Sequence, residues 1–522
     1  MFNRPDDRLL CREVVRRIAR VRSTEATATG TDRGEPRLPP PVASRSVRVL
    51  CWVALVGLIL WLARTGGLYI QAHAPDFEYF YKGGAWLLRH GALDPGYDLV
   101  GGRVERRGTL DWYLPVVPRL MTVLAWLPFD VAGFLWLGLN VVALWGTLRL
   151  LGRNLSGLPP QDWPVTQLVP FTLLLGYWYW EMRLNQINTL TLLLVVGSFT
   201  AWETGRRGIA GFWLGLAVLL KLTPALVVLW FALKRQWRTT IVAGATFVLA
   251  GPAADLVVLG PDATVAAYCG WGQRVLVTGS HRGLILADVE TDWRNQGLAA
   301  LGARWLLPTN YNTRFDNDPR VQHEYGGGPA RYLNVATLPR GVVADLVTAV
   351  LIATLAAFAW LTRRPADRLT SWQLRFEWAL AVLLMLWFMP VMRRYHMIWA
   401  LPATSLLAAG VHYAGVRRRW SALALGSLGL VLAVQLILLP QALVPRGAGS
   451  SHAAVLLAQT VEAAGAILAC VALLAATLTA MLWRLAVNPA ALADPCFASR
   501  GSKGAARLDP DDPVTPVVAA HA

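Results

Sequence analysis

Asp76 and Glu78 are the first residues whose types and position point to chemistry. They lie in the segment Asp76-Phe-Glu-Tyr-Phe-Tyr-Lys, directly after the first hydrophobic stretch. A carboxylate there can take a proton from a reacting hydroxyl, and partial burial at a membrane boundary would raise its pKa usefully. Asp76 is our candidate general base and Glu78 a candidate secondary acid. The alternatives are a helix-capping or solvated Asp76, a Glu78 that simply faces water, and a divalent metal held by the Asp-x-Glu pair.

Cationic residues that suit an anion occur twice in apolar surroundings. Lys221 lies inside the apolar stretch 212–231, where an ionisable side chain is costly enough to suggest a function. Arg393, Arg394 and His396 follow another apolar stretch, and such side chains bind phosphate well. We expect these four residues to hold a phosphate. Snorkelling of Lys221, and headgroup anchoring or internal ion pairing of the later cluster, are the alternatives.

Four amide side chains are candidates for sugar or acceptor contacts. Gln186 and Asn188 would be costly if they faced lipid, so they should face a cavity or a neighbouring helix, and interhelical hydrogen bonding is the simpler explanation. Asn295 and Gln296 lie in a long polar loop and could instead be solvated. Gly211 and Gly215 form a small-xxx-small pair that indicates helix packing.

The composition predicts an all-α polytopic membrane protein. The 522 residues are 55% hydrophobic and only 16% charged, with a mean hydropathy of +0.42 and 24 tryptophans. The five cysteines, at positions 11, 51, 269, 470 and 496, have neither metal-ligand spacing nor the pattern of a disulfide framework. No cofactor is therefore indicated.

Long apolar runs predict about twelve crossings, within a range of about 11–13 transmembrane helices. The expected spans are 49–63, 114–128, 131–150, 166–182, 187–202, 209–233, 238–259, 341–361, 374–391, 396–415, 420–440 and 453–484. The expected domains are a disordered basic tail over 1–45, a membrane domain over 46–485 and a disordered tail over 486–522. Two excursions, 65–113 and 260–340, should be the large loops.

The distribution of the net charge of +17 follows the positive-inside rule rather than a nucleic-acid surface. Basic residues gather in the N-terminal tail and in short turns such as Lys234-Arg235 and Arg363-Arg364. Both tails should therefore be cytoplasmic and both large loops external. Only Arg206-Arg207 conflicts, unless Pro224 breaks the stretch 209–233 into two short helices.

Several motifs, taken together, resemble glycosyltransferase family 87. They are Asp76-Phe-x-Tyr-Phe-Tyr with Gly91 and Tyr97, Tyr113-Leu-Pro, Asn185-Gln186-Ile-Asn188, Gly211-x-x-x-Gly215-Leu-Ala-x-x-x-Lys221-x-x-Pro224, and Tyr395-His396. The resemblance runs from about residue 47 to about residue 415. Gly326-Gly327-Gly328 and the charged stretch 316–320 have no counterpart in that family.

The resemblance implies a C-type glycosyltransferase fold and a polyprenyl-phosphate sugar donor. It implies transfer of a hexose, mannose by analogy, to a lipid or glycan acceptor at the external face of a bacterial cytoplasmic membrane. Asp76 matches the position of the general base in that superfamily. The expected partners are the donor, the acceptor and membrane lipids, without nucleic acid.

A transporter or flippase of lipid-linked anions is the alternative from another class, and other C-type transferases, including protein mannosyltransferases, are close competitors. The sugar, acceptor, anomer, metal dependence and oligomeric state are not determined by these motifs.

Overall fold

A computed structural model describes the parts of the chain that carry the predicted site. The described residues are 43–72, 75–91, 97–100, 103–106, 113–155, 160–287, 290–311, 331–413, 418–438 and 452–487. They all belong to one compact unit, residues 43–492. The two predicted tails lie outside the described residues except for their innermost positions, and so does the stretch 316–328.

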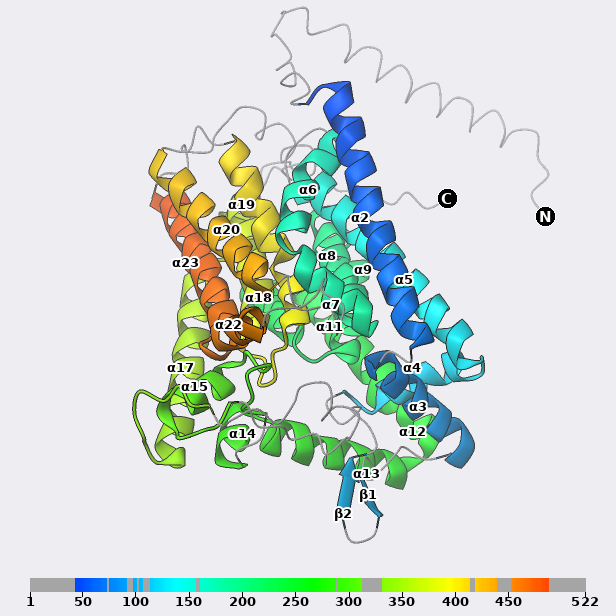
Figure 1. Ribbon diagram of the computed structural model, residues 1–522. Helices are drawn as coiled ribbons and strands as arrows, with labels where there is room; N and C mark the ends of the chain where they lie inside the picture. The colour runs from blue at the N-terminus through cyan, green and yellow to red at the C-terminus, as the bar shows by residue number, and fades with distance from the viewer. Residues whose placement is uncertain are drawn as a thin grey trace, which may run out of the picture. The chain divides into compact units, whose positions relative to one another are not determined.

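The described residues are almost entirely helical, which confirms the predicted fold class (Figure 1). One antiparallel hairpin pairs Tyr97 of β1 with Arg106 of β2. The elements are α2 Arg45–Gln71, α3 Pro75–His90, β1 Tyr97–Val100, β2 Arg103–Arg106, α4 Val116–Ala125, α5 Phe129–Leu150, α6 Trp163–Leu173, α7 Leu175–Leu184, α8 Asn188–Glu203, α9 Arg207–Leu220, α10 Ala225–Leu233, α11 Trp237–Val248, α12 Ala254–Leu259, α13 Pro261–Trp271, α14 His281–Ala287, α15 Leu298–Leu306, α17 Arg340–Leu361, α18 Ser371–Trp387, the 3₁₀ helix η7 Arg394–Ala400, α19 Leu401–Tyr413, α20 Arg418–Leu438, α22 His452–Ala463 and α23 Ala466–Val487.

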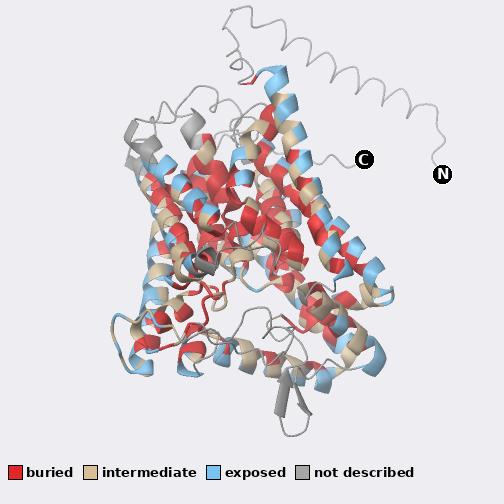
Figure 2. Ribbon diagram, in the orientation of Figure 1, coloured by how far each residue is buried: buried red, intermediate tan, exposed pale blue. Residues whose placement is uncertain are grey.

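Five helical stretches of the described residues are long and apolar enough to cross a membrane, and six if α7 and α8 form one bent crossing. The five are Arg45–Gln71, Phe129–Asn154, Trp237–Leu259, Arg340–Leu361 and Ala466–Trp483. The predicted 11–13 is larger because other expected spans are short or interrupted helices, such as α4 and α9. Many apolar side chains on α2, α11 and α17 are exposed, as a lipid-facing surface requires. Buried residues concentrate where the helices face one another (Figure 2).

Of the two alternatives for 209–233, the break into two short helices at Pro224 is confirmed and the single span is wrong, because the chain turns back within it. α9 and α11 begin side by side, with the Thr239 hydroxyl donating to the Arg207 carbonyl at 3.2 Å. They run in the same direction: a Cβ on Gly211 would lie 2.5 Å from the Thr239 carbonyl, and one on Gly215 would lie 2.6 Å from the Ala243 carbonyl. α10 must therefore return, so Arg206-Arg207 lies at the same end as Lys234-Arg235. The helix-packing role of the two glycines is confirmed.

Two helix breaks bring polar backbone and side chains into the helical bundle. α7 and α8 are bent by 119° at residues 185–187. The second break, residues 221–224 between α9 and α10, ends at Pro224, which cannot donate a helical hydrogen bond. Irregular backbone at membrane depth is tolerated where it is enclosed by protein or lines a cavity. Both breaks carry candidate residues of the site.

The described residues of the two large loops are mainly helical and lie at one end of the long helices. In Figure 1, α3, α4 and α12 to α15 group at the lower end of the view. The first excursion begins later than predicted, because α2 continues to Gln71. α3 packs closely on α4, since a Cβ on Gly84 would lie 2.6 Å from the backbone of Met121. This packing holds α3, whose first turn carries Asp76.

Candidate functional site

Asp76 lies in the first turn of α3, where local sequence favours a helix start. Pro75 suits the first helical position, and a carboxylate in the first turn interacts favourably with the helix dipole. Phe77 and Phe80 are buried in the core cluster with Trp136 and Val116. These aromatic anchors hold the helix start against the long helices. The Asp76 side chain is thereby directed toward the break between α7 and α8.

Asp76 is held by Gln186 from that break. The Gln186 amide nitrogen donates to Asp76 Oδ2, and the Tyr113 hydroxyl donates to Gln186 Oε1 at 3.2 Å. Burial raises the pKa of Asp76 to about 6, against the smaller opposing effects of the Gln186 hydrogen bond and of the Arg393 and Lys221 charges. A carboxylate with such a pKa is a stronger base than one in water and is still mostly ionised at neutral pH.

The break itself is built around Asn185. This residue ends α7 in the left-handed conformation, with φ 53°, which asparagine tolerates better than most residues. Its carbonyl accepts from Trp136 Nε1 at 2.9 Å, and its side chain donates to the Gly133 carbonyl at 3.3 Å. Gln186 therefore sits on a fixed turn rather than on a flexible loop.

Lys221 joins the two helix breaks. It follows the last residue of α9 in an extended conformation, and its Nζ donates to Asn188 Oδ1 at 2.6 Å. The same Nζ lies 2.8 Å from His396 Nε2. Asn188 thus bonds to a neighbouring helix break, as the simpler explanation of its polarity predicted. Snorkelling of Lys221 does not occur, because its amine is held inside the protein.

His396 presents a defined nitrogen to Lys221. Its Nδ1 accepts from the Arg393 backbone N–H at 3.0 Å, so Nε2 carries the hydrogen of the neutral ring. Burial, followed by the charges of Lys221 and Arg393, lowers the pKa of His396 well below its ordinary value. Tyr395 is also near Asp76: burial first, and the Asp76 charge second, raise its pKa well above the usual range.

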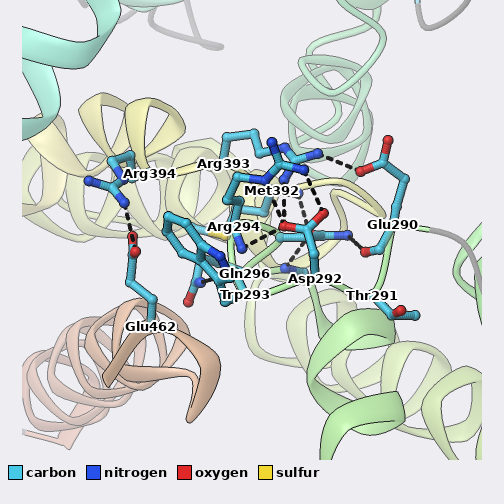
Figure 3. Close-up of polar contacts among 12 residues, drawn as sticks. Glu290, Thr291, Asp292, Trp293, Arg294, Gln296, Met392, Arg393, Arg394 and Glu462 are labelled. Carbon is cyan, nitrogen blue, oxygen red and sulfur yellow. Dashed lines mark hydrogen bonds and ion pairs between the residues drawn. The ribbon is translucent and has the colours of Figure 1, made fainter. Parts of the chain in front are cut away.

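Arg393 is engaged by carboxylates of the second excursion. It donates to Glu290 Oε2 at 2.5 Å and to Asp292 Oδ1 at 3.4 Å, while Arg294 binds the same Asp292 at 2.9 Å (Figure 3). Burial would raise the pKa of Asp292, but the charges of Arg393 and Arg294 outweigh it and hold that pKa well below its ordinary range. Arg393 therefore acts on the site through its charge while its guanidinium is paired.

Arg394 contacts Glu462, a different carboxylate from those that bind Arg393, and two tryptophan rings. It donates to Glu462 Oε2 at 2.6 Å (Figure 3). Its guanidinium lies 4.7 Å from the Trp180 ring centroid and 5.7 Å from that of Trp293. An ion pair of this kind ties η7 to α22. The predicted phosphate role of Arg394 has no support from this geometry.

Asn295 and Gln296 brace the loop that carries Asp292. The Asn295 side chain donates to the Glu290 and Pro390 carbonyls, at 2.8 and 3.1 Å, and accepts from the Gly297 and Met392 N–H groups, at 2.8 and 2.9 Å. Gln296 Nε2 donates to the Trp293 carbonyl at 2.6 Å. These contacts favour a structural role, and sugar contact by either amide stays a prediction.

Glu78 lies apart from the site. Its carboxylate pairs with Lys82, one turn further along α3, at 2.6 Å. Asp76 instead points to Gln186, so the two carboxylates do not share a partner. No cluster of three or more metal-ligating side chains occurs among the described residues. Metal binding by the Asp76 and Glu78 pair thus gains no support.

The fold assembles Asp76, Gln186, Asn188, Lys221 and His396 from four separate segments. The main omission of the sequence analysis is Glu181, a buried carboxylate near the end of α7 that binds Asn188 and Thr189. The signal was available, because an ionisable residue within an apolar stretch is the same criterion that selected Lys221. Chemically, the assembly offers a carboxylate base near two nitrogen donors, the Lys221 amine and the neutral His396 ring, and such donors suit an anionic leaving group.

Comparison with known proteins agrees with that chemistry. A polyprenol-phosphate-mannose-dependent alpha-(1-2)-phosphatidylinositol pentamannoside mannosyltransferase of Mycolicibacterium smegmatis is 29% identical over 213 residues, covering 40% of this chain and 50% of that protein. An enzyme of the same name from Mycobacterium tuberculosis is 26% identical over 255 residues, covering 47% of this chain and 56% of that protein. A polyprenol-phosphate-mannose-dependent alpha-(1-2)-phosphatidylinositol mannoside mannosyltransferase of Mycobacterium tuberculosis is 30% identical over 243 residues, covering 40% and 52%.

The chain spans about half the length of these curated relatives. No solved structure matches it. A sequence profile of glycosyltransferase family 87 matches residues 112–386, a segment that contains Lys221 and Gln186 and begins after Asp76. Because this match covers more than half of its residues, the chain belongs to glycosyltransferase family 87.

Proposed function

We propose that this protein transfers mannose from a polyprenyl-phosphate donor to a lipid or glycan acceptor at the external face of the bacterial cytoplasmic membrane. The observation that carries the proposal is the placement of Asp76 beside the Lys221 and His396 pair, in a family whose curated members above are named as polyprenol-phosphate-mannose-dependent mannosyltransferases. The domain that performs the reaction is the membrane domain, residues 46–485.

In the proposed reaction Asp76 is the general base. The acceptor hydroxyl attacks the anomeric carbon, its proton passes to an Asp76 oxygen, and the bond from that carbon to the phosphate oxygen breaks. The departing polyprenyl phosphate takes the bonding electron pair and gains one negative charge. Gln186 keeps the carboxylate aimed, because its amide binds Oδ2 and leaves the other oxygen available to the acceptor.

Lys221 and His396 suit the leaving phosphate because both present hydrogen-bond donors. The Nε2–H of His396 and the Lys221 amine face one another at 2.8 Å, and the two can be compatible only if Lys221 is uncharged or an anion lies against both. A phosphate oxygen supplies that anion. Both donors can then stabilise the charge that grows on the phosphate as the sugar leaves. Arg393 adds positive charge nearby, while Arg394 stabilises the fold through its ion pair with Glu462.

Removing the amide that stabilises ionised Asp76 should change the pH dependence of transfer. With the pKa of Asp76 about 6, the base is protonated below that pH, so activity should rise with pH through this region. In the Gln186→Met variant the lost hydrogen bond leaves the carboxylate less stabilised, and the acid limb of kcat against pH should move to higher pH. Steady-state rates between about pH 4.5 and about pH 9 would measure this limb, because this range lies on both sides of the Asp76 pKa of about 6.

Tyr113→Phe is the matched control for that shift. It removes the hydroxyl that binds the far side of the Gln186 amide and leaves the contact with Asp76 in place. We expect a smaller displacement of the acid limb than in Gln186→Met. An acid limb unchanged by Gln186→Met would contradict the assignment of the limb to Asp76.

The orientation of the site can be tested with cysteines already present. Cys269 is exposed on α13, within the excursion proposed to be external. Cys11 lies in the tail proposed to be cytoplasmic. In variants that keep a single cysteine, a membrane-impermeant maleimide should label Cys269 in intact spheroplasts and Cys11 only after permeabilisation. The reverse pattern would place the site at the cytoplasmic face.

The activity itself is tested with purified protein in lipid nanodiscs. The protein is given radiolabelled polyprenyl-phosphate mannose and a membrane-lipid extract as the acceptor source. We expect label to appear in a more polar lipid product. The proposal fails if the donor binds and no labelled product forms with any acceptor fraction.

A further inference from the structure

Glu181 is a buried carboxylate that the proposed reaction does not yet use. It is 1% exposed and lies near the end of α7, close to the break that carries Gln186 and Asn188. Within the described residues it forms no direct ion pair, so its burial is not explained by an adjacent cation. A carboxylate at membrane depth is costly, which makes a specific role the expectation.

Both oxygens of Glu181 accept hydrogen bonds. Oε1 accepts from the Thr189 backbone N–H at 3.0 Å and from the Thr189 hydroxyl at 3.1 Å. Oε2 accepts from Asn188 Nδ2 at 2.9 Å. In all three of these hydrogen bonds the Glu181 carboxylate is the acceptor.

This acceptor determines which way the Asn188 amide points. The Asn188 Nδ2 group donates to Glu181 Oε2, so the NH2 group of the amide faces Glu181. The carbonyl oxygen of the same amide then faces Lys221 and accepts from Nζ at 2.6 Å. Glu181 therefore orients the Asn188 amide, and the orientation of that amide places an acceptor next to the lysine amine.

Lys221 depends on this contact for its position. It lies after the end of α9 in extended backbone, and its long side chain would otherwise sample several rotamers. Asn188 Oδ1 accepts from the amine and holds it beside His396 Nε2. An amine fixed in advance binds an anion with a smaller loss of conformational freedom.

We propose that Glu181 is a positioning residue that orients Asn188 and thereby holds Lys221 where it binds the donor phosphate. This inference rests on the proposed function, since it gives Lys221 its role there. Glu181 touches neither the donor nor the acceptor in this account. Its effect reaches the reaction only through Asn188 and Lys221.

The test is a substitution that keeps the shape of Glu181 and replaces one of its acceptor oxygens by an NH2 donor. In Glu181→Gln the new carbonyl would keep the Thr189 donors, so the new NH2 group would face the NH2 group of Asn188. Relief of that clash turns the Asn188 amide over and presents a donor to Lys221. We expect kcat/KM for polyprenyl-phosphate mannose to fall about 10- to 100-fold, mainly through KM for the donor, with KM for the acceptor unchanged.

A second substitution should restore the chain of hydrogen bonds. In the double variant Glu181→Gln/Asn188→Asp, the glutamine NH2 group can donate to the aspartate, whose other oxygen can accept from Lys221. The donor KM should return most of the way to the wild-type value. A residue needed only for folding would not produce this rescue. Thr189→Val is the matched control, because it removes one bond to Glu181 without touching Asn188, and it should keep the wild-type donor KM.

The possible results separate this inference from the proposed function. If wild type transfers mannose and Glu181→Gln has the wild-type donor KM, the inference is overturned and the proposed function stands. If wild type transfers nothing from this donor, both fall. If Glu181→Gln does not fold, Asn188→Ala replaces it, since that variant keeps Glu181 and cuts its link to Lys221. The same rise in donor KM is then expected, and an unchanged donor KM would overturn the inference.

Discussion

Replacing Asp76 with asparagine is expected to lower mannosyl transfer by about 10²- to 10⁴-fold, the range that positioned general bases contribute. The asparagine amide keeps the size of the side chain and cannot take the acceptor proton. Binding of polyprenyl-phosphate mannose should persist, because Lys221 and His396 are intact. Product formation and donor binding would both be measured with purified protein in nanodiscs.

Glu78→Gln is the matched control for this effect. Glu78 lies two residues away in the same helix turn, and its carboxylate pairs with Lys82. Its neutralisation should leave the rate near that of wild type. A rate loss shared equally by the two variants would point to the structure of α3 instead of to a base. Wild-type turnover by Asp76→Asn would remove Asp76 from the mechanism.

The Lys221→Met variant is expected to lose about 10²- to 10³-fold in kcat/KM for the donor, the size of effect seen when one donor to a developing oxyanion is removed. Methionine keeps an unbranched apolar side chain and removes the amine that contacts Asn188 and His396. The loss should appear both in donor affinity and in kcat, because the charge on the phosphate increases as the sugar leaves. Donor titration and single-turnover rates would separate the two.

Lys82→Met provides the comparison for Lys221→Met. The Lys82 side chain is 60% exposed and pairs only with Glu78 among the partners described, so its replacement should have little effect on transfer. A Lys221→Met variant that folds and keeps the wild-type kcat/KM for the donor would show that the phosphate binds elsewhere. Arg393 would then be the next candidate, despite its pairing with Glu290 and Asp292.

Hydropathy predicted where the helices are, but it did not predict where they turn back. Apolar runs identified the sequences of α5, α11 and α17, because a membrane-facing helix must be apolar over its length. A hydropathy average cannot distinguish one crossing from two short helices with a turn between them. The return of α10 depends on the close approach of Gly211 and Gly215 to α11, which only the tertiary structure reveals.

From the sequence, the candidate residues of the site were easier to select than their hydrogen-bond and ion-pair partners. Ionisable and amide side chains in apolar surroundings drew attention to Lys221, Gln186 and Asn188, and the fold places them in a chain of contacts near Asp76. For Arg393 and Arg394 the sequence left phosphate binding and internal ion pairing open, and their carboxylate partners are remote in sequence: Glu290 is 103 residues away, and Glu462 is 68. Charge pairing across such separations cannot be inferred from spacing.

Glu181 was missed for a related reason. It stands among tyrosines and tryptophans next to Arg183, so it resembles the polar end of a span. Its contact with Asn188, seven residues later, forms only because the chain turns back across the helix break. The lesson for membrane enzymes is that a single carboxylate near a predicted span end warrants the same attention as one in the middle.

The central claim is that the sugar comes from a lipid-linked phosphate. The most direct measurement gives purified protein in nanodiscs two radiolabelled donors in parallel, polyprenyl-phosphate mannose and GDP-mannose, with the same lipid acceptor extract. Our account predicts labelled product from polyprenyl-phosphate mannose alone, reduced strongly by Asp76→Asn. Product formed from GDP-mannose without polyprenyl phosphate, or a lipid-linked donor that is bound and moved across the bilayer without sugar transfer, would contradict it.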